Sequence, residues 1–438
     1  MNRLVASIIT IVLVTFLVTA NTHANWPAWR GPDSTGAAGS GNPPIEWSET
    51  KNIKWKVKVP GESLSSPIIW ENKIFFLTAI KTDKPTPTTS DSQTGGGGRR
   101  RMSRPPTAVY SFDLVCMDRN TGSITWQKTA REEFPHEGHH STASFASNSA
   151  ITDGKFVWAG FGSRGIYCYD MDGNKKWERD LGNMTIVAGF GEGSSAALAG
   201  NALIVVMDHE GDSFIYALDK ENGRTLWQKP RDERTSWSTP LPIEVNGKTQ
   251  IIVNATNFVR SYDLQTGDVI WQCGGQTRNV IPCPVTGFGK VICMSGFRGN
   301  TLHAIELGRA GDLSGSNAIK WQVNSGTPYV PSPLLYGDKL YFCSGNRPTI
   351  SCYQADTGKA NYTGQSLEGL GDMYASPVGV ADRIYFVSRN GTAAVIKNSD
   401  TFELLATNKL DDGFDASPAI VGDELYLKGK QNFYCIAE

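Results

Sequence analysis

The sequence predicts an all-β fold, an eight-bladed β-propeller of four-stranded antiparallel blades that is closed by pairing its N- and C-terminal strands. Two periodic features carry this prediction, an Asp-x-x-x-Gly-x-x-x-Trp unit and a Ser-Pro pair, which recur along most of the chain. Their spacing of roughly 40–50 residues is typical of propeller blades. Frequent glycine (46 residues) and proline (22) and an aromatic content of 10% also favour short strands over helices.

The Asp-Gly-Trp unit predicts a turn followed by a strand. Three copies align without gaps, Asp118 to Trp126, Asp219 to Trp227 and Asp263 to Trp271. The aspartate ends the third strand of a repeat and accepts hydrogen bonds from the turn, the glycine supplies a positive φ, and the fourth strand ends at the tryptophan. We therefore assign a structural role to the repeat tryptophans: Trp126, Trp177, Trp227, Trp271 and Trp321.

A second column of residues marks the first strand of each blade. An apolar run follows each member after a short turn such as Glu-Asn or Asp-Gly, which is typical of a β-hairpin. Eight members predict eight blades: Ser66-Pro67, Asn148-Ser149, Ser195-Ala196, Thr239-Pro240, Cys283-Pro284, Ser332-Pro333, Ser376-Pro377 and Ser417-Pro418. The eighth blade lacks its fourth strand, and the segment 53–57, with Trp55 in the tryptophan column, supplies it and removes an exposed edge.

Residues 1–24 have the pattern of a cleavable signal peptide. Arg3 is positively charged, an apolar run from Leu4 to Val18 is shorter than a membrane span, and small residues Thr22 and Ala24 precede the cleavage site. We expect a periplasmic or secreted protein with no transmembrane segment after cleavage. The alternative interpretation is an uncleaved membrane anchor.

The rest of the chain divides into an N-terminal extension, 25–52, and the propeller, 53–438. The extension is expected to lie against the ring through its tryptophans. An insertion at about 81–107 interrupts the first blade and is rich in glycine, proline and arginine. We predict a disordered surface loop here, and the alternative is a basic docking arm.

Charge and cysteine content limit the partners and the covalent chemistry. Lys and Arg number 42 against 43 Asp and Glu, so no global field attracts nucleic acid, and we expect none as a partner and a monomeric chain. Of eight cysteines, Cys116, Cys168, Cys352 and Cys435 share one strand position where other repeats carry alanine or serine, which predicts packing. A disulfide between Cys283 and Cys293 stays open, because their register is ambiguous by one residue.

Candidate ligand-binding residues stand just before each first strand, where they would face the mouth of the central channel. This position selects Glu62, His140, Glu192, Trp237, Tyr329, Tyr374 and Asp415, with Arg30 and Arg298 as weaker candidates. Aromatic side chains with a few acids suit a sugar, a peptide or a quinone. The alternative interpretation is that they fill the channel and satisfy strand ends.

The segment Pro-His-Glu-Gly-His-His contains the densest group of possible metal ligands. Proline and glycine place it in a loop, and its spacing differs from the helical H-E-x-x-H pattern. We assign no metal site and retain His136, His139 and His140 as candidates only.

The repeats resemble the tryptophan-docking repeats of the PQQ-like (quinoprotein-type) β-propeller family, within the WD40/quinoprotein-like superfamily, and in size and blade count its BamB-like exported members. The resemblance covers nearly all of the chain after residue 24. It implies protein binding and outer membrane assembly for the BamB-like branch. For the enzyme branch it implies pyrroloquinoline quinone with Ca²⁺, an adjacent Cys-Cys pair, a Glu/Asn/Asp set for the ion and an Asp base. No two cysteines are adjacent here, and the C-x-x-C-H haem signature is absent.

The functional hypothesis is therefore a non-catalytic exported propeller that acts as a binding or protein-interaction scaffold in the cell envelope. It needs no cofactor, and its partner is an envelope protein or a small ligand. The first alternative is a PQQ-dependent quinoprotein oxidoreductase with calcium. The second alternative is a carbohydrate-binding propeller.

Overall fold

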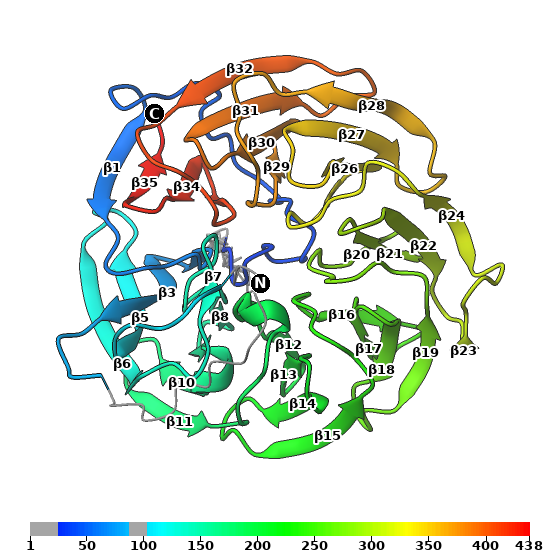
Figure 1. Ribbon diagram of the computed structural model, residues 1–438. Helices are drawn as coiled ribbons and strands as arrows, with labels where there is room; N and C mark the ends of the chain where they lie inside the picture. The colour runs from blue at the N-terminus through cyan, green and yellow to red at the C-terminus, as the bar shows by residue number, and fades with distance from the viewer. Residues whose placement is uncertain (1–24, 87–102) are drawn as a thin grey trace, which may run out of the picture.

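The computed structural model describes residues 25–86 and 103–438, so the predicted signal peptide lies outside the described residues. Eight four-stranded antiparallel blades surround a central axis, which confirms the predicted propeller (Figure 1). The first strand of each blade lies nearest the axis and the fourth lies at the rim. The helical elements of the described residues are two short 3₁₀ turns, η1 (Gly162–Arg164) and η2 (Val187–Gly189).

The first four blades follow the chain order. Their strands are β2 (Ile68–Trp70), β3 (Lys73–Lys81), β5 (Tyr110–Asp118) and β6 (Ile124–Glu133) in blade 1; β8 (Ile151–Thr152), β9 (Phe156–Gly160), β10 (Ile166–Asp170) and β11 (Lys175–Arg179) in blade 2; β12 (Ala197–Ala199), β13 (Ala202–Met207), β14 (Ser213–Asp219) and β15 (Thr225–Arg231) in blade 3; and β16 (Leu241–Val245), β17 (Lys248–Val253), β18 (Val259–Asp263) and β19 (Val269–Cys273) in blade 4. The short strand β23 (Gly311–Asp312) adds to blade 4 parallel to β19.

The last four blades complete the ring. Their strands are β20 (Val285–Gly287), β21 (Lys290–Ser295), β22 (Thr301–Glu306) and β24 (Ile319–Val323) in blade 5; β25 (Leu334–Tyr336), β26 (Lys339–Cys343), β27 (Thr349–Gln354) and β28 (Ala360–Ser366) in blade 6; β29 (Val378–Val380), β30 (Arg383–Val387), β31 (Thr392–Lys397) and β32 (Leu404–Lys409) in blade 7; and β33 (Ala419–Val421), β34 (Glu424–Lys428), β35 (Asn432–Ile436) and β1 (Ile53–Lys58) in blade 8.

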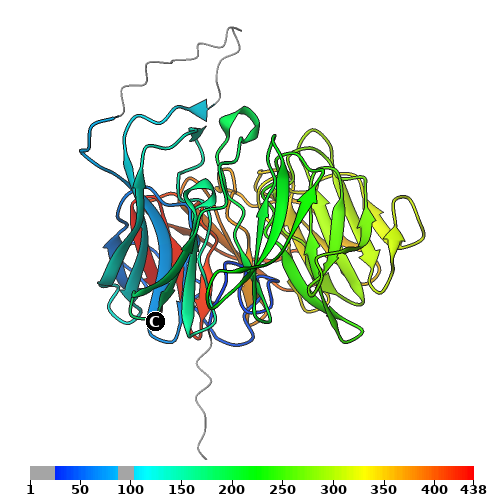
Figure 2. The same cartoon turned by 90° about the horizontal axis from the view of Figure 1, so that it is seen from below.

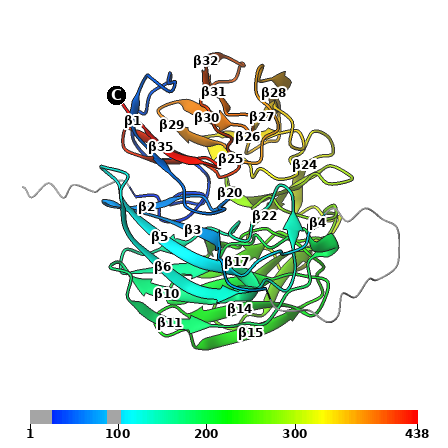
Figure 3. The same cartoon turned by 60° about the vertical axis from the view of Figure 1, so that its left-hand side comes forward.

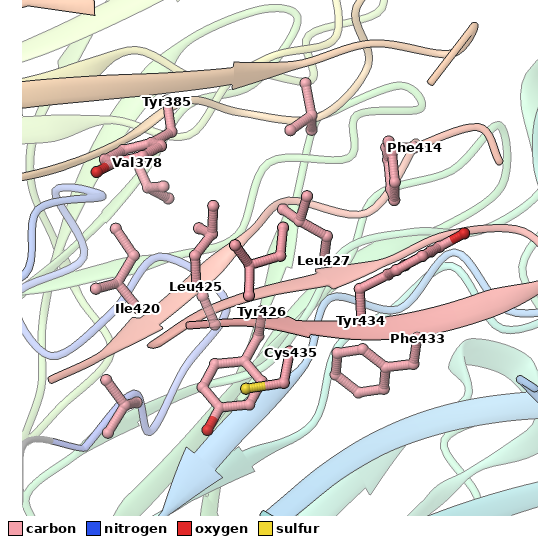
Figure 4. Close-up of a cluster of buried hydrophobic side chains, with 14 of the residues drawn as sticks. Val378, Tyr385, Phe414, Ile420, Leu425, Tyr426, Leu427, Phe433, Tyr434 and Cys435 are labelled. Carbon is pink, nitrogen blue, oxygen red and sulfur yellow. The ribbon is translucent and has the colours of Figure 1, made fainter. Parts of the chain in front are cut away.

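Blade 8 closes the ring as predicted. The N-terminal strand β1 pairs antiparallel with the C-terminal strand β35, and Trp55 lies opposite Cys435 (Figures 1 and 3). Figure 4 shows the core that forms here, where side chains of blades 7 and 8 such as Tyr385, Tyr426 and Phe433 pack together. Strand pairing and apolar burial thus join the two ends of the propeller.

Four of the five repeat tryptophans, Trp126, Trp177, Trp227 and Trp321, dock on the glycine turn of the next blade, whereas Trp271 lies beneath the added strand β23. A Cβ on Gly223 would lie 2.7 Å from the Trp177 indole, and one on Gly267 would lie 2.6 Å from the Trp227 indole. Both indoles also donate a hydrogen bond to a carbonyl of that neighbouring turn. The expectation that the fourth strand ends at the tryptophan was wrong, because the glycine turn is so tight that β15 starts at Thr225 and runs past Trp227.

The cysteine column is explained by the same tryptophans. Cys116 lies directly opposite Trp126 on the adjacent strand, and Cys168 lies opposite Trp177. Only a small side chain fits beside the indole, which is why alanine or serine stands there in other blades. All eight cysteines are buried and unpaired, so Cys283 and Cys293 form no disulfide. Burial raises the pKa of Cys116 and Cys168 to about 12, which makes these thiols unreactive.

The Ser-Pro column forms a closed ring of hydrogen bonds around the axis. In each blade the backbone N–H of the column residue donates to the side chain of the next blade's column residue, at 2.9 to 3.3 Å, with the Cys283 sulfur as one acceptor. The members are Ser66, Ser149, Ser195, Thr239, Cys283, Ser332, Ser376 and Ser417. In blade 2 the pair is Ser149-Ala150 and not the predicted Asn148-Ser149, because Ser149 makes the ring contact.

The N-terminal extension crosses the hole of the ring beneath this hydroxyl ring. The Trp26 backbone pairs with Ile69 of blade 1, and the Pro27 carbonyl accepts from Thr152 of blade 2. On the other side, the buried Arg30 guanidinium donates to the carbonyls of Pro333 and Pro377 in blades 6 and 7. Because blades 2 and 6 lie on opposite sides of the axis, the extension spans the hole. It lies in dark blue across the centre in Figure 1.

Of the predicted insertion, residues 87–102 lie outside the described residues. Its two ends are regular: β3 continues to Lys81, and β4 (Ser103–Arg104) pairs with β7 (His139–His140). Seen edge-on, the cyan and green loops of the first blades rise above one face, and the dark blue N-terminal segment lies toward the other (Figure 2). No helix in residues 25–86 and 103–438 is long and apolar enough to cross a membrane.

Candidate functional site

The centre of the propeller is a cavity of about 1560 Å³ that all eight blades line. Members of the hydroxyl ring, such as Ser66 and Ser376, surround its lower part, and Trp29 of the N-terminal extension contributes to its floor. Trp29 also borders a separate cavity of about 170 Å³ on the other side of the extension. The extension therefore divides the channel, and the larger cavity opens on the face with the raised loops.

Six of the seven predicted channel residues line this cavity. They are His140, Glu192, Trp237, Tyr329, Tyr374 and Asp415. Glu62 does not lie there: its backbone pairs with Ala79 of β3 and its side chain is exposed. The long strand β3 pairs with Glu62 near its far end, beyond the part that pairs with β2, so Leu64 and Ser66 line the cavity in its place. Arg30 lies buried in the extension and does not line the large cavity.

Aromatic side chains form one wall of the cavity. Tyr329, in the loop before blade 6, stacks on Phe297 of blade 5 with ring centroids 4.9 Å apart and planes inclined by 26°. Trp237, in the loop before blade 4, is held in place because its Nε1 donates to the Gly191 carbonyl at 2.8 Å. All three side chains remain partly exposed, so flat faces are available to a ligand.

The carboxylates that line the cavity are already engaged by the protein. Glu192 accepts hydrogen bonds from the backbone and hydroxyl of Ser163 and pairs with the buried Arg164 at 3.1 Å. Asp415 pairs with Arg389 at 2.7 Å and with Lys430 at 3.3 Å.

Glu210, a third cavity carboxylate, accepts two hydrogen bonds from Thr235. Cations therefore balance the charges of Glu192 and Asp415, whereas the exposed Glu210 is held only by a neutral threonine and keeps its negative charge.

His140 lies at the cavity wall. Its imidazole packs edge-on against Phe190, with ring centroids 5.3 Å apart, and its Nδ1 bonds to Thr142. Burial lowers the pKa of His140, and the positive charges of Arg389, His139 and Arg104 lower it further.

Three arginines line the opposite side of the cavity. Arg298 was a weaker candidate from the sequence, and Arg234 and Arg278 were not predicted. Arg234 and Arg278 lie in the loops before blades 4 and 5, and Arg298 lies in the loop between β21 and β22. The predicted channel positions were only those just before each first strand. The loop between the second and third strands reaches the same face, because antiparallel strands return to it. That rule would have drawn attention to Asn257, Phe297 and Arg298.

The candidate metal ligands of the raised loop have protein partners. His136 bonds to the Met184 carbonyl through Nε2 and to Arg164 through Nδ1, and His139 Nδ1 bonds to the His140 backbone carbonyl. Among the described residues, no three His, Cys, Asp or Glu side chains are grouped as a metal site.

The residues of the cavity do not fit pyrroloquinoline quinone with calcium. A calcium ion requires several free oxygen ligands, and the cavity carboxylates Glu192 and Asp415 are neutralised by Arg164, Arg389 and Lys430. The thiol of Cys283 accepts a hydrogen bond within the hydroxyl ring, and no cysteine stands beside it in the sequence. The donor set thus lacks the chemistry that this cofactor requires.

The propeller resembles solved structures of low sequence identity. The crystal structure of BamB from Moraxella catarrhalis matches with a TM-score of 0.55 and 14% identity, covering 82% of this chain and 98% of that chain. The computationally designed Ika8 protein matches with a TM-score of 0.52 and 12% identity, covering 77% and 97%. A europium-containing methanol dehydrogenase matches with a TM-score of 0.47 and 11% identity, covering 92% and 89%. The first two likenesses show the fold alone.

Sequence comparison assigns the family. A search of the curated proteins finds no match to this sequence. The family model described as outer membrane protein assembly factor BamB matches residues 111–363, which is more than half of the chain. The chain therefore belongs to the BamB family of PQQ-like, quinoprotein-type β-propellers.

Proposed function

We propose that this protein is a non-catalytic, exported propeller that acts as a binding scaffold in the cell envelope and holds its ligand in the central cavity. The state of the cavity acids carries the proposal. Glu192 and Asp415 are both held by cations, so neither is free to bind a metal ion or to accept a proton from a substrate. The cavity keeps its aromatic faces and polar side chains, which suit binding.

Two observations support a place outside the cytoplasm. Residues 1–24 have the pattern of a secretory signal, and the family that the chain matches is described as an outer membrane protein assembly factor. The partner is accordingly an envelope protein or a ligand of that compartment. The aromatic wall of Trp237, Tyr329 and Phe297 favours a carbohydrate as the ligand in the cavity.

Two assays on the chain from residue 25 onward test the proposal. Incubated with pyrroloquinoline quinone, Ca²⁺ and a redox dye, the protein is expected to oxidise neither alcohols nor sugars. Dye reduction that depends on substrate and is lost in Glu192→Gln and Asp415→Asn would contradict a non-catalytic role.

The second assay is a thermal-shift screen with a small-molecule and oligosaccharide library. Ligands that raise Tm for the native chain should lose this effect in Trp237→Ala, whose side chain lines the cavity. Phe288→Ala is the matched control, because Phe288 is an exposed aromatic residue outside the cavity. Ligands that stabilise both variants equally would place binding outside the cavity and contradict the proposal.

A further inference from the structure

The charges of the cavity are divided unevenly between its two sides. Arg234, Arg278 and Arg298 project from blades 3 to 5, are exposed, and make no ion pair with any described carboxylate. Internal cations hold Glu192 and Asp415, so the exposed Glu210, which accepts from Thr235, is one free acid set against these three arginines. The accessible charge of the cavity is therefore cationic on the arginine side, although the whole chain has a formal net charge of -1.

The aromatic wall adjoins these arginines. The Arg298 guanidinium lies 5.4 Å from the centroid of the Phe297 ring, which in turn stacks on Tyr329. Another cavity ring, that of Tyr374, has the Arg389 guanidinium 4.4 Å from its centroid. A flat ligand on these rings would bring its own anionic groups within reach of free guanidinium N–H donors.

The backbone N–H groups of the column residues at the lower cavity wall are already in use. The N–H groups of the column residues, such as Ser66 and Ser376, are used in the hydroxyl ring. The first strands that follow are paired to the second strands of the same blades. At the level of the column residues the cavity therefore presents side chains to a ligand. Amide and hydroxyl side chains of Asn257, Asn279 and Thr256 also line the cavity and match sugar hydroxyls.

The cavity also exceeds the size of a single small molecule. Its volume of about 1560 Å³ lies above the roughly 300–1,000 Å³ of ordinary small-molecule pockets. A ligand of several sugar units fills such a space while its ring faces stack on several aromatic side chains in turn.

We infer that the cavity binds an acidic oligosaccharide, whose carboxylate or sulfate groups contact Arg234, Arg278 and Arg298 and whose sugar faces stack on Trp237, Tyr329 and Phe297. This inference rests on the proposed binding function and narrows it to one ligand class. Uronic acids and sulfated sugars present the same chemistry to a guanidinium group, so the experiment includes both.

Isothermal titration calorimetry on the chain from residue 25 onward tests the inference with four probes: tetragalacturonic acid, a chondroitin sulfate tetrasaccharide, neutral maltotetraose and tetraglutamate. One or both acidic sugars should bind, and their affinity should fall steeply between about 50 mM and about 500 mM NaCl. Arg278→Gln and Arg298→Gln should each weaken binding about tenfold, because each removes a charge-assisted hydrogen bond.

Arg224→Gln is the matched control, because Arg224 is an exposed arginine in the blade 3 turn, outside the cavity, and the variant should bind normally. If maltotetraose bound as tightly as the acidic sugars, or if the arginine variants bound normally, the inference of an anionic ligand would be wrong. The proposal that the cavity binds a ligand would still stand. Tetraglutamate binding as tightly as the acidic sugars would overturn the carbohydrate assignment. If no probe binds, the inference fails, and the thermal-shift screen decides separately whether the cavity binds another ligand.

Discussion

At the residue scale, the turn glycines of the repeat meet two separate demands. Gly223 has a φ of +74°, which side chains rarely adopt, and its Cα faces the Trp177 indole of the preceding blade. Gly247, in the turn between β16 and β17, has the same φ of +74° but nothing within 4 Å of a Cβ. The pair separates the cost of backbone conformation from the cost of crowding the docked tryptophan.

Replacing each glycine by alanine should show this difference. Gly247→Ala should lower the free energy of unfolding by about 1 kcal/mol, the cost of the left-handed backbone. Gly223→Ala should lower it by about 1–3 kcal/mol more, because the methyl group displaces the indole. Urea denaturation measures both values. Equal losses in the two variants would show that the indole contact at Gly223 has no energetic weight.

Lys428 gives the second prediction at this scale. Its ammonium is buried at the end of β34 and donates to the Ser63 carbonyl at 2.7 Å. Burial lowers the pKa of Lys428 to about 7, against the attraction of Asp415 and Asp412. Above this value the native protein releases the proton while the unfolded chain keeps it up to the ordinary lysine pKa.

The unfolded state therefore binds more protons than the native state between pH 7 and about pH 10, so Lys428 makes stability rise with pH in this window. The slope is at most about 1.4 kcal/mol per pH unit, the value for one proton. Urea denaturation at pH 7, 8 and 9 measures this effect. The free energy of unfolding of the native chain, relative to that of Lys428→Met, should increase from pH 7 to pH 9. Lys359→Met, at an exposed lysine, is the control and should leave the pH dependence unchanged.

At the scale of the element, the fourth strand of each blade connects that blade to the adjacent one through side-chain packing. In blades 1, 2, 3, 5 and 8 its tryptophan packs on the glycine turn of the next blade. A β-bulge follows the small residue that faces the tryptophan, as at Ala217/Leu218 and Ser261/Tyr262. Blade 7 carries Ala406 at this position. Blade 8 takes its fourth strand from the other end of the chain and has no turn between its third and fourth strands, so a tryptophan in blade 7 would have no glycine turn to dock on.

Tryptophans that dock in different ways should differ in their contribution to stability. Trp271 is fully buried beneath the added strand β23, whereas Trp227 is half-buried on its glycine turn. Trp271→Ala should cost about 3–5 kcal/mol and Trp227→Ala about 1–3 kcal/mol in the free energy of unfolding. Leu226→Ala, at the exposed neighbouring position, should cost little. If Trp227→Ala lost as much stability as Trp271→Ala, burial would not explain the contributions of these two tryptophans.

At the scale of the whole molecule, stability depends on closing the ring. The hydroxyl ring is continuous through the joint, since Ser417 donates to Ser66, and the β1 and β35 pair forms the outer half of blade 8. The N-terminal extension adds contacts across the hole, from Ile69 in blade 1 to Pro377 in blade 7.

A chain that begins at Val59 lacks both β1 and the extension. Without β1, the strand β35 becomes a long unpaired edge that pairs with other chains. We expect this chain to form oligomers or aggregates in size-exclusion chromatography with light scattering, whereas the chain from residue 25 elutes at the mass of one copy. A monomeric, fully cooperative Val59 chain would show that strand closure is dispensable.

The sequence alone determined the repeat and the ring. The Ser-Pro and Asp-Gly-Trp columns are local patterns, and their number and spacing gave eight blades, the closing strand at Trp55 and the channel positions of Trp237 and Tyr329. These features depend on strand period and turn chemistry, which neighbouring residues in the chain decide.

Only the tertiary structure decided what those columns contact and which charges remain free. Glu62 left the channel because β3 extends to pair beside it, and Arg30 became part of a floor by bonding to carbonyls of blades 6 and 7. Likewise, Glu192 and Arg164 belong to different blades yet pair in space, whereas Arg298 pairs with no carboxylate in residues 25–86 and 103–438. The physical reason is that ion pairing and burial are set by which loops converge at the axis, and that convergence involves residues from every blade at once.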